Sequence, residues 1–466
     1  MDTTVLKKIW KEKYQIAAPQ FEKISNVQAV ATGFNANIDA ICQMSGESLS
    51  KLIAAENLSL NELENIDHTA ILTLKDFIKG VFKAFRLGIA EEWICEDEKV
   101  YELLKSNIEC SHLQIGGQGG IMANALSTVG VQKVFVHTNS LPKLQADQFV
   151  KCNNLISFDE KAKAKPAHKI NRKNDLPLIH FIIEFKRGDT VIVEGKKFRC
   201  PRANRFIATY DPLNLNLVLD ESFMKNMLQT KLDFVFLSGF HALLSKKGGV
   251  KLIKTIAKKI KSWKKENPET IFHLEIASTQ DVLIRRAIAE QLVPLADSIG
   301  INERETIDLL HVLDFPALAK RCDENTTAEN LLKALAKIKE KTGVKRVQLH
   351  MFGLYMTLQD KNFPITAKQN LAGMLTAAVV GASKAKTGSL EKHDVLEIKP
   401  DVSDVGLIEL ESLAILLDQP NLITEGIGRY ISWDLIAVPT ILIENPISLV
   451  GMGDTISSVS LVAARS

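Results

Sequence analysis

The chain of 466 residues is 46% hydrophobic and 24% charged, with a formal net charge of +3. This length is large for a single hydrophobic core, so we expect two domains, or one large domain that carries an insertion. The nearly balanced charge gives no general argument for binding to nucleic acid or to a membrane surface.

The sequence carries no sign of a membrane segment or a secretion signal. No apolar run approaches the ~20 residues of a membrane span, and the N-terminal stretch "MDTTVLKKIWKEKY" is charged and amphipathic. The cysteines form no CxxC pair, which favours reduced structural thiols over a disulfide framework or a zinc site. They are Cys42, Cys95, Cys110, Cys152, Cys200 and Cys322. We therefore expect a cytoplasmic protein.

Short apolar runs along the chain predict fully buried strands. They cover residues 27–34, 133–139, 232–240, 270–277, 346–353 and 437–444. Helical patterns separate several of them, for example residues 248–266 and residues 327–343, the second ending at Gly343 as a C-cap. This alternation predicts an α/β fold with a mostly parallel sheet, whose ligands bind beyond the carboxyl ends of the strands.

Two regions break the alternation of strands and helices. Residues 45–112 are polar and rich in helical patterns, whereas residues 168–210 contain β-rich pieces that predict a hairpin turning at "KRGD", residues 186–189. Together they predict a smaller sheet-and-helix lid over the main sheet. Residues 390–430 are helical in pattern and carry little recognisable chemistry.

Polar side chains and glycines follow the first predicted strand. Asn35, Asn37 and Asp39 come at alternate positions, which suits hydrogen bonds to several sugar hydroxyls, although an Asx-rich turn has the same composition. In "IGGQGGIMANAL", residues 115–126, four glycines surround Gln118 and would permit close approach of a ligand, or form only a tight turn. Neither a GxxxxGK[ST] loop nor GxGxxG spacing is present.

The stretch "GMGD" lies near the C-terminus, ahead of a helical pattern. Gly451, Met452 and Gly453 could present backbone N–H groups to an anion at a helix N-terminus. Asp454 would then lie beside the transferred group as a base. The alternative is that Asp454 only caps its helix.

Eight segments in chain order resemble the ADP-dependent sugar kinases, that is, the ADP-dependent glucokinases and phosphofructokinases of the ribokinase-like superfamily. The segments are "GFNANIDAI", "IGGQGGIMANAL", "IHFIIEF", "PRANRFIA", "FHLEIAS", "GINERE", "LHMFGLY" and "NPISLVGMGDTISS". The resemblance implies a Rossmann-type large α/β domain with a mostly parallel central sheet, formed by residues 1–34, 113–167 and 211–466. It also implies a smaller α/β lid, formed by residues 35–112 and 168–210.

The same resemblance implies roles in phosphoryl transfer. Asp454 would be the catalytic base, Gly451, Met452 and Gly453 the anion hole, and Arg205 the lid arginine that reaches the phosphates of ADP. Mg²⁺ would be held mainly through water by Asp454, by Glu275 of the HxE motif with His273, and by Glu305 of the NxxE motif. Asn302, His350 and Tyr355 would belong to the nucleotide site.

For the acceptor the resemblance implies Asn35, Asn37, Asp39, Gly117, Gln118 and His180 as ligands of sugar hydroxyls. Arg199, with Lys173 or Arg172, would bind a sugar 6-phosphate, whereas Glu91 or Glu92 would bind glucose. We therefore predict an ADP-dependent phosphofructokinase that also accepts glucose. An ADP-dependent glucokinase, an ATP-dependent sugar kinase of the same superfamily and a non-catalytic sugar or nucleotide sensor remain as alternatives.

Overall fold

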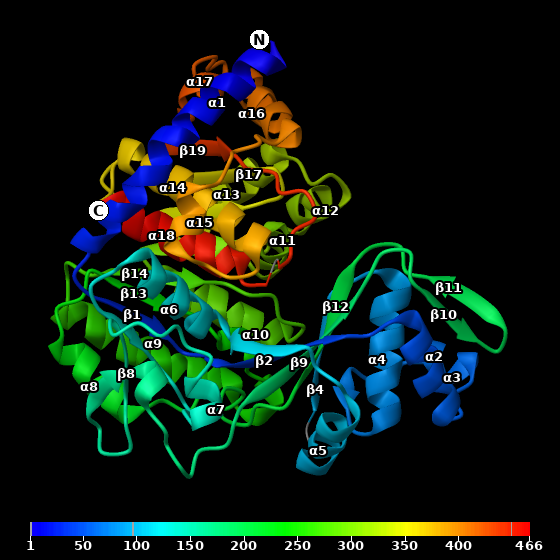
Figure 1. Cartoon of the computed structure of the whole chain (residues 1–466). Coiled ribbons are helices and arrows are strands. Elements are labelled where there is room, and N and C mark those ends of the chain that lie inside the picture. Colours follow the sequence, from blue (N-terminus) through cyan, green and yellow to red (C-terminus); the bar gives the residue numbers. More distant parts are fainter. Residues whose placement is uncertain (1, 96, 449) are drawn as a thin grey trace.

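The computed structural model describes residues 2–95, 97–448 and 450–466, which build two sheets in two lobes (Figure 1). Within these described ranges, the large sheet has 11 strands in the order β18-β19-β17-β16-β15-β14-β13-β1-β6-β7-β8. Seven neighbouring strands, from β16 to β7, are parallel, and the strands at both edges are antiparallel. The predicted α/β fold with a mostly parallel sheet is thus confirmed. 

The strands of the large sheet are short and mostly buried. They are β1 (Val30–Gly33), β6 (Val134–Val136), β7 (Leu155–Phe158), β8 (Ala164–Pro166), β13 (Phe234–Leu237), β14 (Ile271–Glu275), β15 (Ser298–Ile301), β16 (Arg346–His350), β17 (Leu354–Gln359), β18 (Ile427–Tyr430) and β19 (Trp433–Pro439). Every residue of β1, β13 and β15 is buried, as expected for parallel strands with helices on both faces.

Helices cover both faces of this sheet. In the large lobe they are α1 (Thr3–Ala17), α6 (Gln118–Val129), α7 (Lys143–Ala146), α8 (Glu221–Gln229), α9 (Gly249–Glu266), α10 (Val282–Ala287), α11 (Glu303–Val312), α12 (Pro316–Glu324), α13 (Ala328–Thr342), α14 (Ala367–Thr387), α15 (Lys392–Leu396), α16 (Asp404–Leu417), α17 (Leu422–Glu425) and α18 (Met452–Arg465). The pairs α14–α18, α6–α18 and α1–α14 pack together on one face, and α13 packs on β16 and β17 from the other. The helices predicted at residues 248–266 and 327–343 are α9 and α13, and Gly343 ends α13 with a φ of 72°.

One predicted strand of the large sheet is displaced. The run at residues 437–444 is strand only to Pro439, because β19 begins earlier, at Trp433, and pairs with β17 through residues 434–439. The structure also adds β7, β8, β15, β17 and β18, which we did not predict. β15 is only four residues long and contains Gly300, and β17 follows the turn at Gly353, so neither stands out as an apolar run.

The small sheet has the order β3-β4-β12-β9-β2-β5. Its strands are β2 (Asn37–Gln43), β3 (Ala70–Ile71), β4 (Glu91–Cys95), β5 (His112–Gly116), β9 (Ile179–Phe185) and β12 (Asn204–Thr209), with α2 (Gly46–Ala55), α3 (Leu60–Glu64), α4 (Leu74–Leu87) and α5 (Glu98–Asn107) in the same lobe. A separate apolar core forms between this sheet and its helices. β5 belongs to the small sheet by its pairing with β2, although residues 113–116 lie beyond the predicted lid segment.

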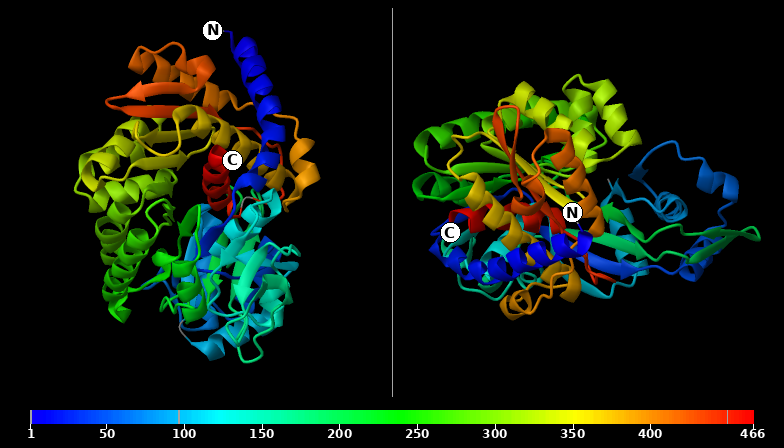
Figure 2. Two further views of the ribbon diagram at one scale, coloured as in Figure 1. Left: turned by 90° about the vertical axis from the view of Figure 1, so that its left-hand side faces the viewer. Right: turned by 90° about the horizontal axis from the view of Figure 1, so that it is seen from above.

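The hairpin predicted at "KRGD" is wrong in its position. β9 pairs with β12 and β2, and the hairpin is formed instead by β10 (Thr190–Val193) and β11 (Lys196–Arg199). Its two turn residues, Glu194 and Gly195, have φ values of 49° and 78°, which suits the tight turns that twist with antiparallel strands. Figure 2 shows this hairpin projecting from the small lobe, away from the main body.

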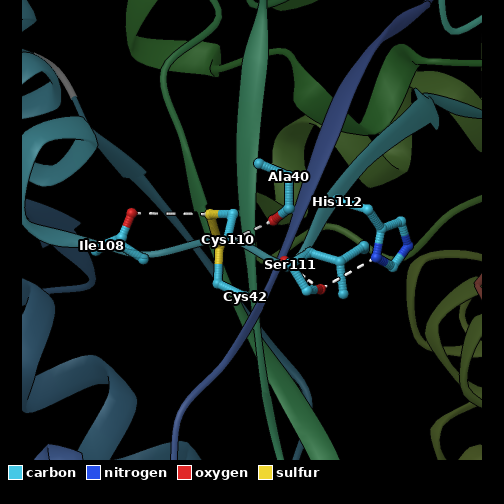
Figure 3. The surroundings of a disulfide bond; sticks show 7 residues. Ala40, Cys42, Ile108, Cys110, Ser111 and His112 are labelled. Carbon is cyan, nitrogen blue, oxygen red and sulfur yellow. Dashed lines mark hydrogen bonds between the residues drawn. A yellow bond between two sulfur atoms is a disulfide. The ribbon is translucent and has the colours of Figure 1, made fainter.

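A disulfide corrects the prediction of reduced cysteines. Cys42 in β2 bonds to Cys110, which lies just before β5, with the two Cα atoms 4.0 Å apart (Figure 3). The pairing of β2 with β5 brings these two positions together across 68 residues of sequence, which spacing alone does not reveal. Cys95, Cys152, Cys200 and Cys322 are free.

Within the described ranges, no helix combines the length and apolar character needed to cross a lipid bilayer.

Candidate active site

The first part of the site is the segment that connects β1 of the large sheet to β2 of the small sheet. Asn35 follows β1, and its side-chain oxygen accepts hydrogen bonds from Gly119 N (3.3 Å) and from Ser238 Oγ (3.2 Å). Asn37 donates from Nδ2 to Asp39 Oδ1 at 2.8 Å. A Cβ on Gly116 would lie 2.0 Å from that same Asp39 oxygen, so the glycine leaves the space that the carboxylate occupies. A Cβ on Gly117 would lie 2.6 Å from Asn37 Oδ1 and 2.8 Å from Asn35 O, so these three predicted sugar ligands lie close together.

A polar face of the small sheet continues from Asp39. Across the small sheet, Asp39 pairs with His180, and His180 pairs with Thr209. Ile207, two residues before Thr209 in β12 and therefore on the same face, pairs with Glu92. All of these residues thus share one face of the sheet. His180 Nε2 lies 3.0 Å from Asp211 Oδ2, and Thr209 donates to Glu92 Oε1 at 2.7 Å. Burial raises the pKa of Asp39 to about 6, against the lowering effects of His180 and of the hydrogen bond from Asn37.

The side chains of Glu91 and Glu92 point to opposite faces of the small sheet. Glu91 points to the other face of the small sheet, where it accepts a hydrogen bond from Trp93 Nε1 at 2.7 Å and lies 2.5 Å from Lys83 Nζ. Glu92 is exposed on the face shared with Asp39 and His180. Of the two glutamates, therefore, only Glu92 lies beside the predicted sugar ligands.

The second part of the site is the N-terminus of α18. Gly451 precedes the helix with a φ of 64°, a left-handed conformation that favours glycine. A Cβ on Gly453 would lie 2.5 Å from His350 Nε2, so this turn also requires a residue without a side chain. Asp454 lies in the first turn of α18 with 8% of its surface exposed, and its carboxylate accepts a hydrogen bond from Gln118. Gln118 thus connects the acceptor loop to the "GMGD" turn.

Asp454 is part of a crowded group of acidic side chains. Burial, and then the neighbouring charge of Glu275, raise the pKa of Asp454 to about 7, while Lys384 lowers it. Burial raises the pKa of Glu275 as well, and the pKa of Glu305 is raised first by burial and then by Glu275 and Asp454. The three carboxylates predicted around Mg²⁺ are therefore close enough to repel one another.

Local structure fixes two of these carboxylates. Glu275 ends β14 and accepts a hydrogen bond on Oε2 from His273 Nε2 at 3.0 Å, while a Cβ on Gly300 would lie 2.0 Å from the same oxygen. Glu305 forms a capping box with Asn302 at the start of α11: Asn302 N donates to Glu305 Oε2 at 2.8 Å, and Glu305 N donates to Asn302 Oδ1 at 2.9 Å. The NxxE motif thus has a helix-capping role in addition to any role in binding.

Lys384, which the sequence analysis missed, is the cation of this group. From α14, its Nζ donates to Thr455 Oγ1 at 3.0 Å and to Gly451 O at 3.3 Å. Burial lowers the pKa of Lys384 to about 8, against the raising effects of Asp454 and Asp39. It also lines a cavity of about 330 Å³ with residues of β5, including His112 and Gln114. No motif marks this lysine, because it reaches the site only through the packing of α14 on α18.

The donors around Asp454 suit a hard divalent cation such as Mg²⁺. Carboxylate oxygens of Asp454, Glu275 and Glu305 are the ligand type that Mg²⁺ prefers, and their mutual repulsion would be relieved by a cation. Among the described residues, no three acidic, histidine or cysteine side chains converge closely enough to form a complete metal site.

The remaining predicted residues lie in different surroundings. His350 Nε2 is 3.8 Å from Glu275 Oε1, so it adjoins the acidic group. Tyr355 packs against the core of the large lobe near Tyr14, and burial raises its pKa. Arg205 lies in β12 on the polar face, close enough to Asp39 to lower the pKa of that carboxyl group.

The predicted phosphate ligands are not gathered with Asp454. Arg199 is exposed at the end of β11, where its guanidinium packs over the turn at Gly188. Lys173 is exposed in the loop before β9. Arg172 has a structural role instead, since it donates to Phe158 O and forms an ion pair with Asp220 at 2.6 Å.

Comparison with known proteins gives consistent results. Residues 28–463 match the family described as "ADP-specific Phosphofructokinase/Glucokinase conserved region". The chain is 28% identical to the ADP-specific phosphofructokinase of Methanosarcina acetivorans, over 95% of this chain and 94% of that protein. It is 30% identical to the ADP-dependent glucose/glucosamine kinase of Pyrococcus abyssi, over 97% and 98%.

A solved structure covers nearly the same length. It is described as an ADP-dependent kinase in complex with fructose-6-phosphate and ADPbetaS, and it matches with a TM-score of 0.83 and 26% identity over 98% of this chain and 97% of its own. The two lobes therefore have a close structural counterpart.

Proposed function

Because the chain belongs to the family of ADP-specific phosphofructokinases and glucokinases, and is thus an ADP-dependent sugar kinase, we propose that it phosphorylates the 1-hydroxyl of fructose 6-phosphate. The β-phosphoryl group of ADP would be transferred, giving fructose 1,6-bisphosphate and AMP. The observation that carries the proposal is the placement of Asp454 in the first turn of α18, joined through Gln118 to the loop that holds Asn35.

The position of Asp454 and its raised pKa support the role of a general base. Its pKa of about 7 leaves a large fraction of the carboxylate ionised at neutral pH, yet makes it basic enough to accept a proton from a sugar hydroxyl. Asp39 and Gln118 would orient that hydroxyl from the two lobes. The proton would move to Asp454 as the hydroxyl oxygen attacks phosphorus and the bond to the AMP phosphate breaks.

Stabilisation of the transferred phosphoryl group would come from the turn before α18. The backbone N–H groups of Met452 and Gly453 are at the helix N-terminus, where the peptide dipoles favour negative charge. Removing one such donor typically slows an enzyme by about 10²- to 10³-fold. Lys384 adds a positive charge beside Asp454, and Arg205 adds another from the small sheet.

Glu275, Glu305 and Asp454 are the residues that would hold Mg²⁺, with water completing the ligand set. The ion would neutralise negative charge on the phosphates of ADP. The protein's own contribution is to bury these carboxylates and to hold Glu275 and Glu305 through His273 and Asn302.

We infer glucose as a second acceptor from the position of Glu92. It lies on the face that carries Asp39 and His180, where a carboxylate can accept hydrogen bonds from sugar hydroxyls. Arg199, by contrast, would serve only a phosphorylated acceptor, because an arginine binds a phosphate through two parallel hydrogen bonds. The two side chains therefore provide separate tests of the two acceptors.

The proposal is tested by measuring kcat/KM with ADP for fructose 6-phosphate and for glucose. We expect Arg199→Ala to lower the value for fructose 6-phosphate by tenfold or more and to leave glucose unchanged. We expect Glu92→Gln to do the reverse, with Glu91→Gln as the matched control because Glu91 faces away from the site. A wild-type enzyme that uses ATP as well as ADP, or an Arg199→Ala variant with unchanged activity on fructose 6-phosphate, would contradict the proposal.

A further inference from the structure

A fully buried arginine lies beneath the acidic group. Arg346 in β16 has no exposed surface, and burial lowers its pKa to about 9, which still leaves it charged at neutral pH. In the part of the chain that the structure describes, no carboxylate lies within ion-pair distance of its guanidinium. Its hydrogen-bond acceptors are Ser298 Oγ at 2.9 Å, Gln348 Oε1 at 2.6 Å and Asn370 Oδ1 at 3.1 Å, all of them neutral. A buried charge without a paired charge is costly, so a function for it is expected.

The hydrogen bonds of Arg346 lead to Glu275 through two further residues. Ser298 Oγ, which accepts from Arg346, lies 3.0 Å from His273 Nδ1, and His273 Nε2 lies 3.0 Å from Glu275 Oε2. Ser298 and His273 are both completely buried, and Glu275 has 3% of its surface exposed. No contact in this series needs a bridging water.

The partners at both ends favour one direction for the bonds of this series. A guanidinium can only donate, so Ser298 Oγ accepts from Arg346. The hydroxyl keeps a second lone pair, but its own proton has no acceptor other than His273 Nδ1 among the described hydrogen bonds, so donation to Nδ1 is the arrangement that satisfies it. The imidazole then carries its proton on Nε2, which donates to Glu275. Without Arg346, the hydroxyl could turn and accept from Nδ1–H, which would place the lone pair of Nε2 against the carboxylate.

We propose that Arg346 is a positioning residue, which acts through Ser298 to hold His273 as the Nε2–H tautomer and so orients Glu275 toward the site of phosphoryl transfer. The inference rests on the proposed function, because it concerns the carboxylate that would hold Mg²⁺ there. A histidine whose tautomer is fixed by a more distant hydrogen bond is a common way of orienting groups around a metal ion.

The other hydrogen bonds of Arg346 allow a purely structural role, which the test must separate. Gln348 Oε1 also accepts from Ser460 Oγ of α18 at 2.7 Å, and Asn370 is in α14. Loss of Arg346 would therefore weaken the packing of both helices. A measurement of stability or of activity alone would not distinguish the two roles.

The experiment compares Ser298→Ala, Arg346→Met and Arg346→Lys with the wild-type protein. Thr357→Val is the matched control, since Thr357 is a fully buried residue of the neighbouring strand whose hydroxyl contacts only Met374 Sδ among the described hydrogen bonds. Two readouts are used: the ¹⁵N chemical shifts of the His273 ring in the protein without metal, and Mn²⁺ affinity from the electron paramagnetic resonance signal of the free ion.

We expect wild-type His273 to show an unprotonated Nδ1 and a protonated Nε2. Arg346→Met should give a mixture of tautomers, Ser298→Ala should shift the Nδ1 signal, and both should weaken Mn²⁺ binding about 10- to 100-fold. Arg346→Lys, which retains a donor, should recover part of the loss, and Thr357→Val should change neither readout. The wild-type tautomer in Arg346→Met, or Mn²⁺ affinity within twofold of wild type in both Arg346→Met and Ser298→Ala, would overturn the inference. If the protein failed to phosphorylate any sugar with ADP, the proposed function would fail while the tautomer measurement would still decide this inference.

Discussion

Asp454, the proposed general base, is a residue at which the requirements of catalysis and of folding would differ. The pKa of Asp454 is about 7, against 3.8 for an ordinary aspartate, because burial and Glu275 disfavour its charge. The folded protein therefore binds this proton more tightly than the unfolded chain. Stability contributed by the protonated form is complete below pH 3.8 and is lost as the pH rises through about 7.

Replacement of Asp454 by asparagine should separate activity from stability. We expect Asp454→Asn to lower kcat by at least about 10²-fold, because the proton acceptor is gone. At pH 8 we also expect it to raise the free energy of unfolding by roughly 1–4 kcal/mol, since no buried charge has to form. Turnover assays and urea unfolding at pH 6 and pH 8 measure both effects.

In the wild-type enzyme, kcat/KM should fall as the pH is lowered through about 7, as the base becomes protonated. A rate that stays constant between pH 6 and pH 8, or an Asp454→Asn variant less stable than wild type at pH 8, would contradict this account.

Sequence patterns singled out residues near glycines at the ends of strands or the starts of helices, and missed those that arrive by packing. Asn35 lies between β1 and β2, and Gln118 and Asp454 lie in the first turns of α6 and α18. Lys384 lies inside a helix and meets the site through a neighbour 71 residues away. The choice between Glu91 and Glu92 depends on strand register, because adjacent residues of a strand face opposite sides.

At the scale of elements, the predicted active site depends on how closely α14 and α18 approach each other. Gly373 of α14 lies directly against the backbone of α18, where an added Cβ would be 2.2 Å from Ser460 O. Gly381, two turns later in the same helix, would place its Cβ 3.1 Å from Cε of Met452, the end of a flexible side chain. The same substitution at these two positions should therefore have different effects.

Gly373→Ala should force α14 and α18 apart and lower the free energy of unfolding by about 1–3 kcal/mol. Gly381→Ala is the control, and it should be neutral or stabilising by up to about 1 kcal/mol, because alanine favours a helix more than glycine does. Urea unfolding of both variants, with kcat as a second readout, tests the difference. Equal losses of stability would show that close approach at Gly373 is not what holds the two helices together.

Local sequence predicted where several strands lie, but it did not predict which strands pair with each other. Continuous apolar runs predicted β1, β13 and β14 because parallel strands are buried on both faces. The hairpin was misplaced because residues 186–189 and 194–195 both resemble turns, and the pairing of β9 with β2 and β12, distant in sequence, decides between them. Local composition carries no information about that pairing.

For the whole molecule, the disulfide joins the two ends of one long segment of the small lobe. Cys42 and Cys110 enclose α2 to α5, a loop of 68 residues, so their bond restricts the unfolded chain considerably. In the chain-entropy treatment, closing a loop of this length contributes about 4 kcal/mol.

Reduction should therefore destabilise the small lobe more than the large one. We expect dithiothreitol to lower the Tm of the wild-type protein, and we expect a Cys42→Ser/Cys110→Ser variant to have the lower Tm with or without reductant. Differential scanning calorimetry measures both, and Cys152→Ser is the control because Cys152 is free and lies in the large lobe. A wild-type Tm that is indifferent to reductant would contradict a stabilising role for the bond.

The chain passes between the two lobes at the acceptor loops: residues 34–36 connect β1 to β2, and Gly117 connects β5 to α6. The sugar would then be held at the pivot between the lobes, while the hairpin that carries Arg199 lies far from it (Figure 1). When two bodies rotate about a pivot, points near the axis hardly move and distant points sweep the widest arc. Contacts to the sugar hydroxyls would therefore change little with the angle between the lobes, whereas the position of the β10–β11 hairpin relative to the large lobe would change most.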